Sequence, residues 1–209
     1  MYNRTHLLMA AALSCAVAAP VVLATEKPPT GEPKAAVTML HAKNDAKLTV
    51  TSTSFGNGAI LSEAYTQDGA DKSPNLSWTA GPAGTEAYVV LAEDTSVKRA
   101  EPIDHWVVYD IPASATMLPE GLGVEAKLVS PIGAIQGKNI ANKVGYIGPK
   151  PPAGETHLYH FEVFALDKKL NLAPERANRE AVIKAMQGHV LAQGELIAFY
   201  TGTKNGSKD

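Results

Sequence analysis

Cysteine is nearly absent from this chain of 209 residues: Cys15 is the only one, and it lies in an apolar stretch near the amino terminus. One thiol cannot form an internal disulfide, so the fold must depend on its hydrophobic core. If the amino-terminal stretch is removed, no thiol remains. That excludes cysteine nucleophiles, thiolate metal sites and redox motifs from the mature protein.

An excess of charge of either sign is also missing, since 19 basic residues stand against 21 acidic ones and the formal net charge is −2. Without a basic excess to neutralise phosphates, a nucleic-acid partner is not expected. A content of 45% hydrophobic and 19% charged residues excludes a disordered chain. The length is enough for one domain with a substantial core.

Three common catalytic motifs do not occur in the sequence. There is no Gly-x-Ser-x-Gly, no His-Glu-x-x-His and no phosphate-binding loop that ends in Gly-Lys-Ser or Gly-Lys-Thr. The sequence therefore lacks the signatures of an α/β-hydrolase, a zinc protease and a P-loop nucleotide hydrolase.

Residues 1–24 have the pattern of a secretory signal peptide. Arg4 gives a positive start, residues 7–23 are almost wholly apolar, and Ala24 precedes a polar run. We predict cleavage near Ala24 and export to the periplasm or the medium. We expect no cofactor. Cleavage nearer Ala18, an uncleaved anchor, and lipid attachment at Cys15 are the alternatives. Cleavage removes Arg4 and no acid, so the net charge of the mature chain falls from −2 to −3.

The remaining chain divides into three parts. Residues 25–47 contain paired prolines and mixed charges without periodicity, which predicts a flexible, solvated linker. Residues 48–203 are predicted to form one domain, and residues 204–209 a disordered tail.

Four segments of the domain have strand patterns: residues 48–53, 88–92, 105–111 and 157–166. Neither face of the last segment is clearly polar, which predicts a central strand. The content of 17 glycines and 14 prolines favours many turns between strands. We expect a mainly β fold, sandwich-like, with two antiparallel or mixed sheets.

Only the end of the domain has a helical pattern. Asn178 is a predicted N-cap, and Val182, Ile183, Met186 and Val190 follow at helical spacing. We expect this helix to end or restart near Gly194 and a separate helical turn to begin at Pro174, giving one or two C-terminal helices.

Polar residues stand at the ends of three predicted strands. Asp94 ends one, while His105 and His157 each begin another, and His157 follows a loop rich in proline and glycine at 148–154. These residues could meet at one rim of the sandwich, or each could be an isolated strand-end residue. The loop could form a rigid cavity wall or an ordinary turn.

Several motifs occur in a fixed order. They are Asp94, His-Trp-Val-Val-Tyr-Asp-Ile-Pro at 105–112, Gly-Tyr-Ile-Gly-Pro-Lys-Pro-Pro-Ala-Gly at 145–154, His-Leu-Tyr-His-Phe at 157–161, and Ala-Met-Gln-Gly-His-Val-Leu-Ala at 185–192. Together they resemble the phosphatidylethanolamine-binding protein family, in its bacterial Raf-kinase-inhibitor-like branch. The resemblance covers about residues 48–200.

The resemblance implies a two-sheet β fold with C-terminal helices and a small anion pocket at one end. The residues that it implies for the pocket are Asp94, His105, Gly148, Pro149, Pro151, Pro152, His157 and Tyr159. Imidazoles, a phenol and loop amides can donate to phosphate oxygens while a carboxylate orients an imidazole. The implied partner is a small phosphorylated anion or a phospholipid headgroup, with no metal.

The sequence departs from the family pattern at two positions. Ser96 stands where the family has the second Asp of Asp-Pro-Asp-Ala-Pro, and Leu158 stands where it has the Arg of His-Arg-Tyr. We hypothesise that an acid and a base that support each other in the family were lost together here, which requires the two positions to be in contact. Lys98 and Arg99 could add positive charge at the rim, or could belong to a solvated loop.

These observations favour an exported, non-catalytic protein that binds a small anion. One alternative is a protease inhibitor or regulatory protein, with a protease as its partner. Another is a hydrolase that uses Asp94, His105 and His157 as a metal site, or Ser96 as a nucleophile with His105 as its base. The oligomeric state, including a homodimer, is left open.

Overall fold

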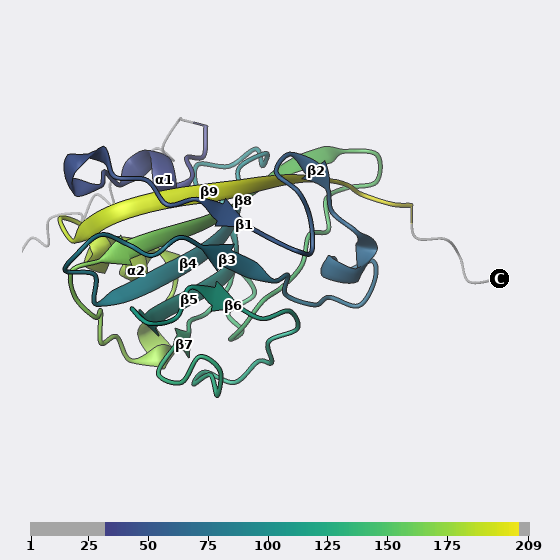
Figure 1. Cartoon of the computed structure of the whole chain (residues 1–209). Helices are drawn as coiled ribbons and strands as arrows, with labels where there is room; N and C mark the ends of the chain where they lie inside the picture. The colour runs from purple at the N-terminus through teal and green to yellow at the C-terminus, as the bar shows by residue number, and fades with distance from the viewer. Residues whose placement is uncertain (1–31, 205–209) are drawn as a thin grey trace, which may run out of the picture.

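Two β-sheets make up most of the structure, a computed structural model that describes residues 32–204 (Figure 1). The smaller sheet has the order β1-β3-β6, with β1 at Val50–Thr51, β3 at Leu76–Trp78 and β6 at Met117–Leu118. The larger sheet has the order β2-β9-β8-β4-β5-β7, with β2 at Ala59–Ile60, β9 at Val190–Thr201, β8 at Thr156–Leu166, β4 at Ala87–Asp94, β5 at Ile103–Pro112 and β7 at Ile135–Gln136. The expected signal peptide and nearly all of the expected tail lie outside the described residues.

The larger sheet is mixed, because β2 pairs with β9 in parallel while the other strand pairs are antiparallel. The predicted mainly β, two-sheet architecture is confirmed. The three longer predicted strands match β4, β5 and β8 to within two residues at each end, whereas residues 48–53 contain only the two-residue β1.

Both faces of the larger sheet are buried, and this explains its uninterrupted apolar runs. All eight residues of β4 are buried. Tyr88 and Val90 face the smaller sheet and pack with Trp78, whereas Val89 and Leu91 face the other way. We call these the inner and the outer face of the larger sheet. The outer face is covered by α2 (Arg179–Met186) and by the segment around α1 (Ala36–Met39).

The remaining helical elements are short: η1 (Lys43–Asp45), η2 (Glu63–Tyr65) and η3 (Pro174–Arg176). The predicted N-cap of α2 is confirmed, since Asn178 Oδ1 accepts a hydrogen bond from Ala181 N at 3.0 Å. The helical turn expected at Pro174 is η3. Among the described residues, no helix is long and apolar enough to span a membrane.

The expectation that the C-terminal helix ends or restarts near Gly194 is wrong. The helix ends at Met186, Gly188 turns the chain with a φ of 76°, and Val190 begins the 12-residue strand β9 instead of extending or restarting a helix. β9 pairs with β8 along its length. Gly194 is a site of close backbone approach, because a Cβ there would lie 2.1 Å from Leu48 O.

The carboxyl-terminal part of the expected linker also differs from the expectation. Ala35, Ala36, Leu40 and Ala42 are buried on the outer face of the larger sheet. The backbone N–H of Ala36 donates to Glu93 Oε2 at 3.0 Å. The small apolar residues of this segment pack on the outer face of the sheet, in the same cluster as residues of α2.

Candidate functional site

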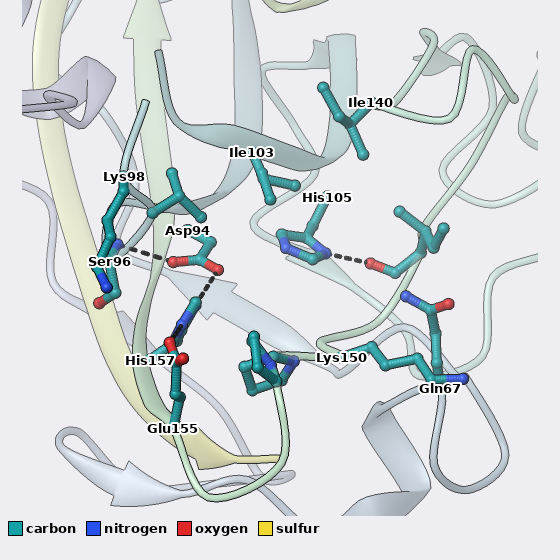
Figure 2. Close-up of a pocket in the computed structure, with 14 residues that line it drawn as sticks. Gln67, Asp94, Ser96, Lys98, Ile103, His105, Ile140, Lys150, Glu155 and His157 are labelled. Carbon is teal, nitrogen blue, oxygen red and sulfur yellow. Dashed lines mark hydrogen bonds and ion pairs between the residues drawn. The ribbon is translucent and has the colours of Figure 1, made fainter. Parts of the chain in front are cut away.

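A cavity of about 480 Å³ lies where three central strands end (Figure 2). Since β4 is antiparallel to both β5 and β8, the end of β4 lies beside the beginnings of the other two strands. The structure therefore brings Asp94, His105 and His157 to one rim. The full lining is Gln67, Asp94, Ser96, Val97, Lys98, Ile103, His105, Ile140, Ile147, Lys150, Pro151, Pro152, Glu155 and His157.

Asp94 and His157 form a buried pair in the cavity wall, with Asp94 Oδ2 2.7 Å from His157 Nδ1. The other carboxylate oxygen, Oδ1, accepts a hydrogen bond from Ser96 N at 2.8 Å. Both oxygens of Asp94 are thus engaged, and the imidazole of His157 is held in one orientation. Its second nitrogen, Nε2, lies 3.5 Å from Glu155 Oε2, a carboxylate at the mouth of the cavity whose side chain is 55% exposed.

His105 is held from the opposite wall. Its Nδ1 lies 2.7 Å from the carbonyl oxygen of Ile147. Because a carbonyl oxygen can only accept, the proton is on Nδ1, and in the neutral ring Nε2 is an acceptor. Nε2 is buried and has no hydrogen-bond partner among the residues that the structure describes. Burial lowers the pKa of His105, although the Ile147 carbonyl and Asp94 oppose this.

Tyr159 lies behind this wall and does not line the cavity itself. Its ring packs edge-on against the His105 ring, with centroids 5.4 Å apart. Burial and the nearby Asp94 carboxylate raise the pKa of Tyr159 above its usual value, so the phenol keeps its proton. Its buried oxygen has no hydrogen-bond partner within residues 32–204.

The loop at 148–154 has two functions in the geometry. Pro151 and Pro152 line the cavity, while Gly148 and Pro149 fasten the loop to a distant turn. Gly148 N donates to Asp71 Oδ1 at 2.6 Å, and Pro149 O accepts from Gln67 N at 3.1 Å. A Cβ on Gly148 would lie 2.6 Å from Tyr65 O, so this close approach requires glycine.

Some lining residues were not anticipated from the sequence. Gln67 reaches the cavity from the turn after η2, and its side chain donates to Gly148 O at 2.7 Å. Ile103 and Ile140 supply apolar wall and lie in no motif, whereas Ile147 lies in the motif at 145–154 without having been assigned to the pocket. Glu155 stands two residues before His157, and Lys150 lies inside the proline-rich motif. Closeness in sequence to predicted pocket residues was therefore the only signal for these two residues.

The charged loop after β4 borders three neighbouring cavities. Lys98 lines the cavity with Asp94 and His157, as one of the two expectations for it required. Arg99 instead lines neighbouring hollows, one of them formed with Glu101, Asp104 and Arg179.

The two positions that depart from the family pattern are in contact. Leu158 N donates to Ser96 Oγ at 2.9 Å. An acid at 96 and a base at 158 would therefore be neighbours, as the hypothesis of joint loss requires. In this chain a hydroxyl and a backbone amide make the contact.

The two hydrolase arrangements are not seen in the described part of the chain. Ser96 Oγ forms no hydrogen bond with a histidine there. In the same residues the one trio of histidine and carboxylate groups whose ligand atoms all lie within 4.8 Å of one another is His160, Glu162 and Glu195, not Asp94, His105 and His157.

Comparison with known proteins gives a consistent result. The family model described as phosphatidylethanolamine-binding protein matches residues 51–201. The UPF0098 protein PH1269 of Pyrococcus horikoshii is 38% identical over 147 residues, which cover 70% of this chain and 73% of that protein. The UPF0098 protein YbhB of Escherichia coli is 37% identical over 134 residues, which cover 64% of this chain and 84% of that protein.

Solved structures share the fold. The crystal structure of E. coli YbcL has a TM-score of 0.69 at 29% identity and covers 75% of this chain and 99% of its own. That of CT736, a phosphatidylethanolamine-binding protein homologue from Chlamydia trachomatis, has a TM-score of 0.64 at 32% identity and covers 75% of this chain and 98% of its own. On the extent of these matches, the chain belongs to the phosphatidylethanolamine-binding protein family.

Proposed function

We propose that this protein is exported and that its cavity binds a small phosphorylated anion, either free or as a phospholipid headgroup, without turning it over. The observation that carries the proposal is the gathering of His105, His157, Lys98 and Lys150 around one cavity of about 480 Å³. That volume is within the usual range for small-molecule sites. The name of the family, phosphatidylethanolamine-binding protein, points to the same ligand class.

The attraction for an anion has to come from this cavity, because the chain as a whole has a net charge of −2. Lys98 and Lys150 are exposed at the mouth and supply mobile positive charge. His157 donates its Nδ1–H to Asp94, and when the ring is protonated it also offers an Nε2–H whose direction Asp94 fixes. Such charge-assisted hydrogen bonds are the stronger kind, and the preset ring orientation lowers the entropy that binding costs.

His105 adds a preference within the phosphate class. Its neutral ring offers a bare Nε2 acceptor, which a ligand proton can satisfy. Inorganic phosphate and phosphate monoesters carry a P–OH near pH 6, whereas a phosphodiester does not. We therefore expect phosphate and phosphoethanolamine to bind more tightly than glycerophosphoethanolamine, the diester headgroup of a lipid.

Calorimetric titration with these three compounds tests the proposal. The variants His105→Ala and His157→Ala should abolish the heat of binding, while His189→Ala, whose ring pairs with Asp167 away from the cavity, should keep it. If none of the three compounds binds to the wild-type protein, the proposal is wrong. Tighter binding of the diester would identify the lipid headgroup as the ligand and remove the role given to His105.

Export and the lack of turnover have separate tests. Cleavage near Ala24 gives a mature chain that begins at Thr25, which the intact mass of periplasmic protein will show. Release of phosphate from a phosphomonoester, lost in Ser96→Ala, would establish the hydrolase alternative. Tight inhibition of an exported protease, unaffected by the two histidine variants, would establish the inhibitor alternative.

A further inference from the structure

A second cluster of ionisable side chains lies on the outer face of the larger sheet, away from the cavity. His160 and Glu162 project from β8 on the face opposite to His157 and Tyr159, because successive residues of a strand point to opposite faces. Glu195 of β9 stands directly across from Glu162 in the strand register. One ligand atom from each of His160, Glu162 and Glu195 lies within 4.8 Å of the other two.

The electrostatics of this cluster are unbalanced. Two carboxylates directly opposite each other on paired strands repel, and Glu162 is fully buried. The guanidinium of Arg179 does not balance them, because it is bonded to Glu93 at 2.7 Å and to Glu101 at 3.0 Å. A cation placed between Glu162 and Glu195 would relieve this repulsion.

Glu162 also has an unused ligand atom. Its Oε1 accepts a hydrogen bond from Val37 N at 3.0 Å, which fixes the carboxylate beneath α1. Its Oε2 is buried and has no hydrogen-bond partner in the part of the chain that the structure describes. A buried carboxylate oxygen normally has a partner, so this one needs an explanation.

His160 is arranged as metal-binding histidines usually are. Its Nδ1 lies 2.8 Å from Glu195 Oε2, and its Nε2 lies 3.1 Å from Thr95 Oγ1. Without a metal, Nδ1–H donates to Glu195 and Nε2 accepts from the threonine hydroxyl. A metal ion bound at Nδ1 would displace the Nδ1 proton, and the threonine hydroxyl could then rotate to accept from Nε2–H. A second group that fixes the tautomer and the ring in this way is typical of metal sites.

We propose that His160, Glu162 and Glu195 bind one transition-metal dication of the Zn²⁺ class, with water completing the coordination on the exposed side of Glu195. One imidazole and two carboxylates favour Zn²⁺ over Mg²⁺ and Ca²⁺, which prefer sites made of oxygen ligands alone. The cation would join β8 to β9 and act as a structural site, since these side chains lie on the face of the sheet opposite to the cavity.

The test uses the untagged protein after chelation and dialysis, titrated with Zn²⁺. We expect one ion per chain and a rise in Tm of about 5–10 °C at a hundredfold excess over the Kd. Co²⁺ in place of Zn²⁺ should give a visible absorption band from the bound ion. Ca²⁺ and Mg²⁺ at the same concentration should leave the Tm unchanged.

Two variants assign the site. Glu162→Gln keeps the size of the side chain and removes the buried charge, so the metal-free protein should fold with an unchanged or higher Tm and still lose the response to Zn²⁺. His160→Asn should lose it as well. His189→Asn is the matched control, because His189 pairs with Asp167 at 2.8 Å but belongs to no such trio of ligand groups among the described residues.

Several results would overturn the assignment. These are the absence of any Zn²⁺ response in the wild-type protein, an equal response to Ca²⁺, or a full response in Glu162→Gln. Because Glu162→Gln is expected to fold, its loss of the Tm shift separates metal binding from general destabilisation.

Discussion

Glu93 and Asp94 are consecutive buried carboxylates at the end of β4, and they differ in what surrounds them. Glu93 points to the outer face, where Arg179 Nε at 2.7 Å and Ala36 N at 3.0 Å occupy its two oxygens and the segment around α1 covers it. Asp94 points to the inner face, where its partner His157 lines an open cavity. The Glu93–Arg179 pair is covered by the chain and stabilises the fold. The Asp94–His157 pair faces a cavity, where the histidine is accessible to a ligand.

The two carboxylates also differ in whether the polar groups around them have hydrogen-bond partners. Both oxygens of Glu93 are bonded to other parts of the chain, and its partner Arg179 further donates to Lys34 O at 3.0 Å. Around Asp94 the chain leaves polar atoms without partners, notably His105 Nε2 and the Tyr159 hydroxyl, within the described residues. Buried polar atoms without partners cost stability, so a site that keeps them is suited to a ligand that supplies the missing bonds.

Breaking the outer pair should have the largest effect on stability. Arg179→Met leaves the fully buried Glu93 without its cation, and loss of one member of a buried ion pair costs about 3–5 kcal/mol. We expect the free energy of unfolding, measured in urea, to fall by this amount. Phosphate affinity, measured without urea where the variant is folded, should be unchanged. Lys43→Met is the control, since its exposed bridge to Asp167 should contribute less than about 1 kcal/mol. A loss below that of the control would show that the outer pair is not structural.

Breaking the inner pair should change binding more than folding. Asp94→Asn keeps the shape but weakens the bond that orients His157, and we expect about 1–3 kcal/mol of lost stability. Phosphate affinity should fall by about tenfold, by analogy with the loss of metal affinity when a group that orients a metal-binding histidine is removed. Asp167→Asn is the matched control, because it weakens a similar bond to His189 at 2.8 Å away from the cavity and should leave phosphate affinity unchanged. Equal phosphate titrations for Asp94→Asn and the wild type would contradict the orienting role.

The sequence predicted the inner region better than the outer one. Asp94, His105 and His157 end or begin strands with strong apolar patterns, so strand topology alone brings them together. The outer face depends on pairings that no local pattern encodes. Val190 continues the helical spacing of Val182 and Met186, yet the long pairing with β8 makes it the start of a strand.

The same limit applies within the cavity. Gln67 lies far from the other lining residues in sequence and reaches them only because the loop at 148–154 docks on its turn. The burial of Ala36 beside Glu93 could not be predicted from the sequence, because a short run of small apolar residues after a polar segment has no periodicity. Local pattern predicts elements, whereas the contacts between distant turns have to be seen in the structure.

The pH dependence of stability should separate His105 from a carboxyl in the neighbouring hollow. Burial lowers the pKa of His105, so below its unfolded value of about 6.5 the unfolded chain binds more protons and stability falls as the pH is lowered. Burial raises the pKa of Asp104 to about 6, so its contribution to stability is lost as the pH rises from about 4 to 6.

Thermal unfolding between pH 4 and pH 8 measures both effects. Relative to His105→Gln, the wild type should lose stability as the pH falls from 7 to 5. Relative to Asp104→Asn, it should lose stability as the pH rises from 4 to 6. A constant difference between the wild type and His105→Gln across this range would mean that His105 titrates equally in the folded and unfolded states.

The smallest expected effect concerns the exposed lysines of the cavity. Lys98→Met and Lys150→Met each remove one screened charge near the bound anion, and pairs of this kind contribute about 0.2–1 kcal/mol. Phosphate affinity should therefore fall by a factor of about 1.4 to 5 in each variant. The loss should shrink at 0.5 M salt, where the Debye length falls to about 4 Å. Lys72→Met, whose bridge to Glu120 is away from the cavity lining, should bind as the wild type does. If a lysine variant abolished binding at both salt concentrations, that lysine would hold the anion directly, and the buried histidines would no longer explain the affinity.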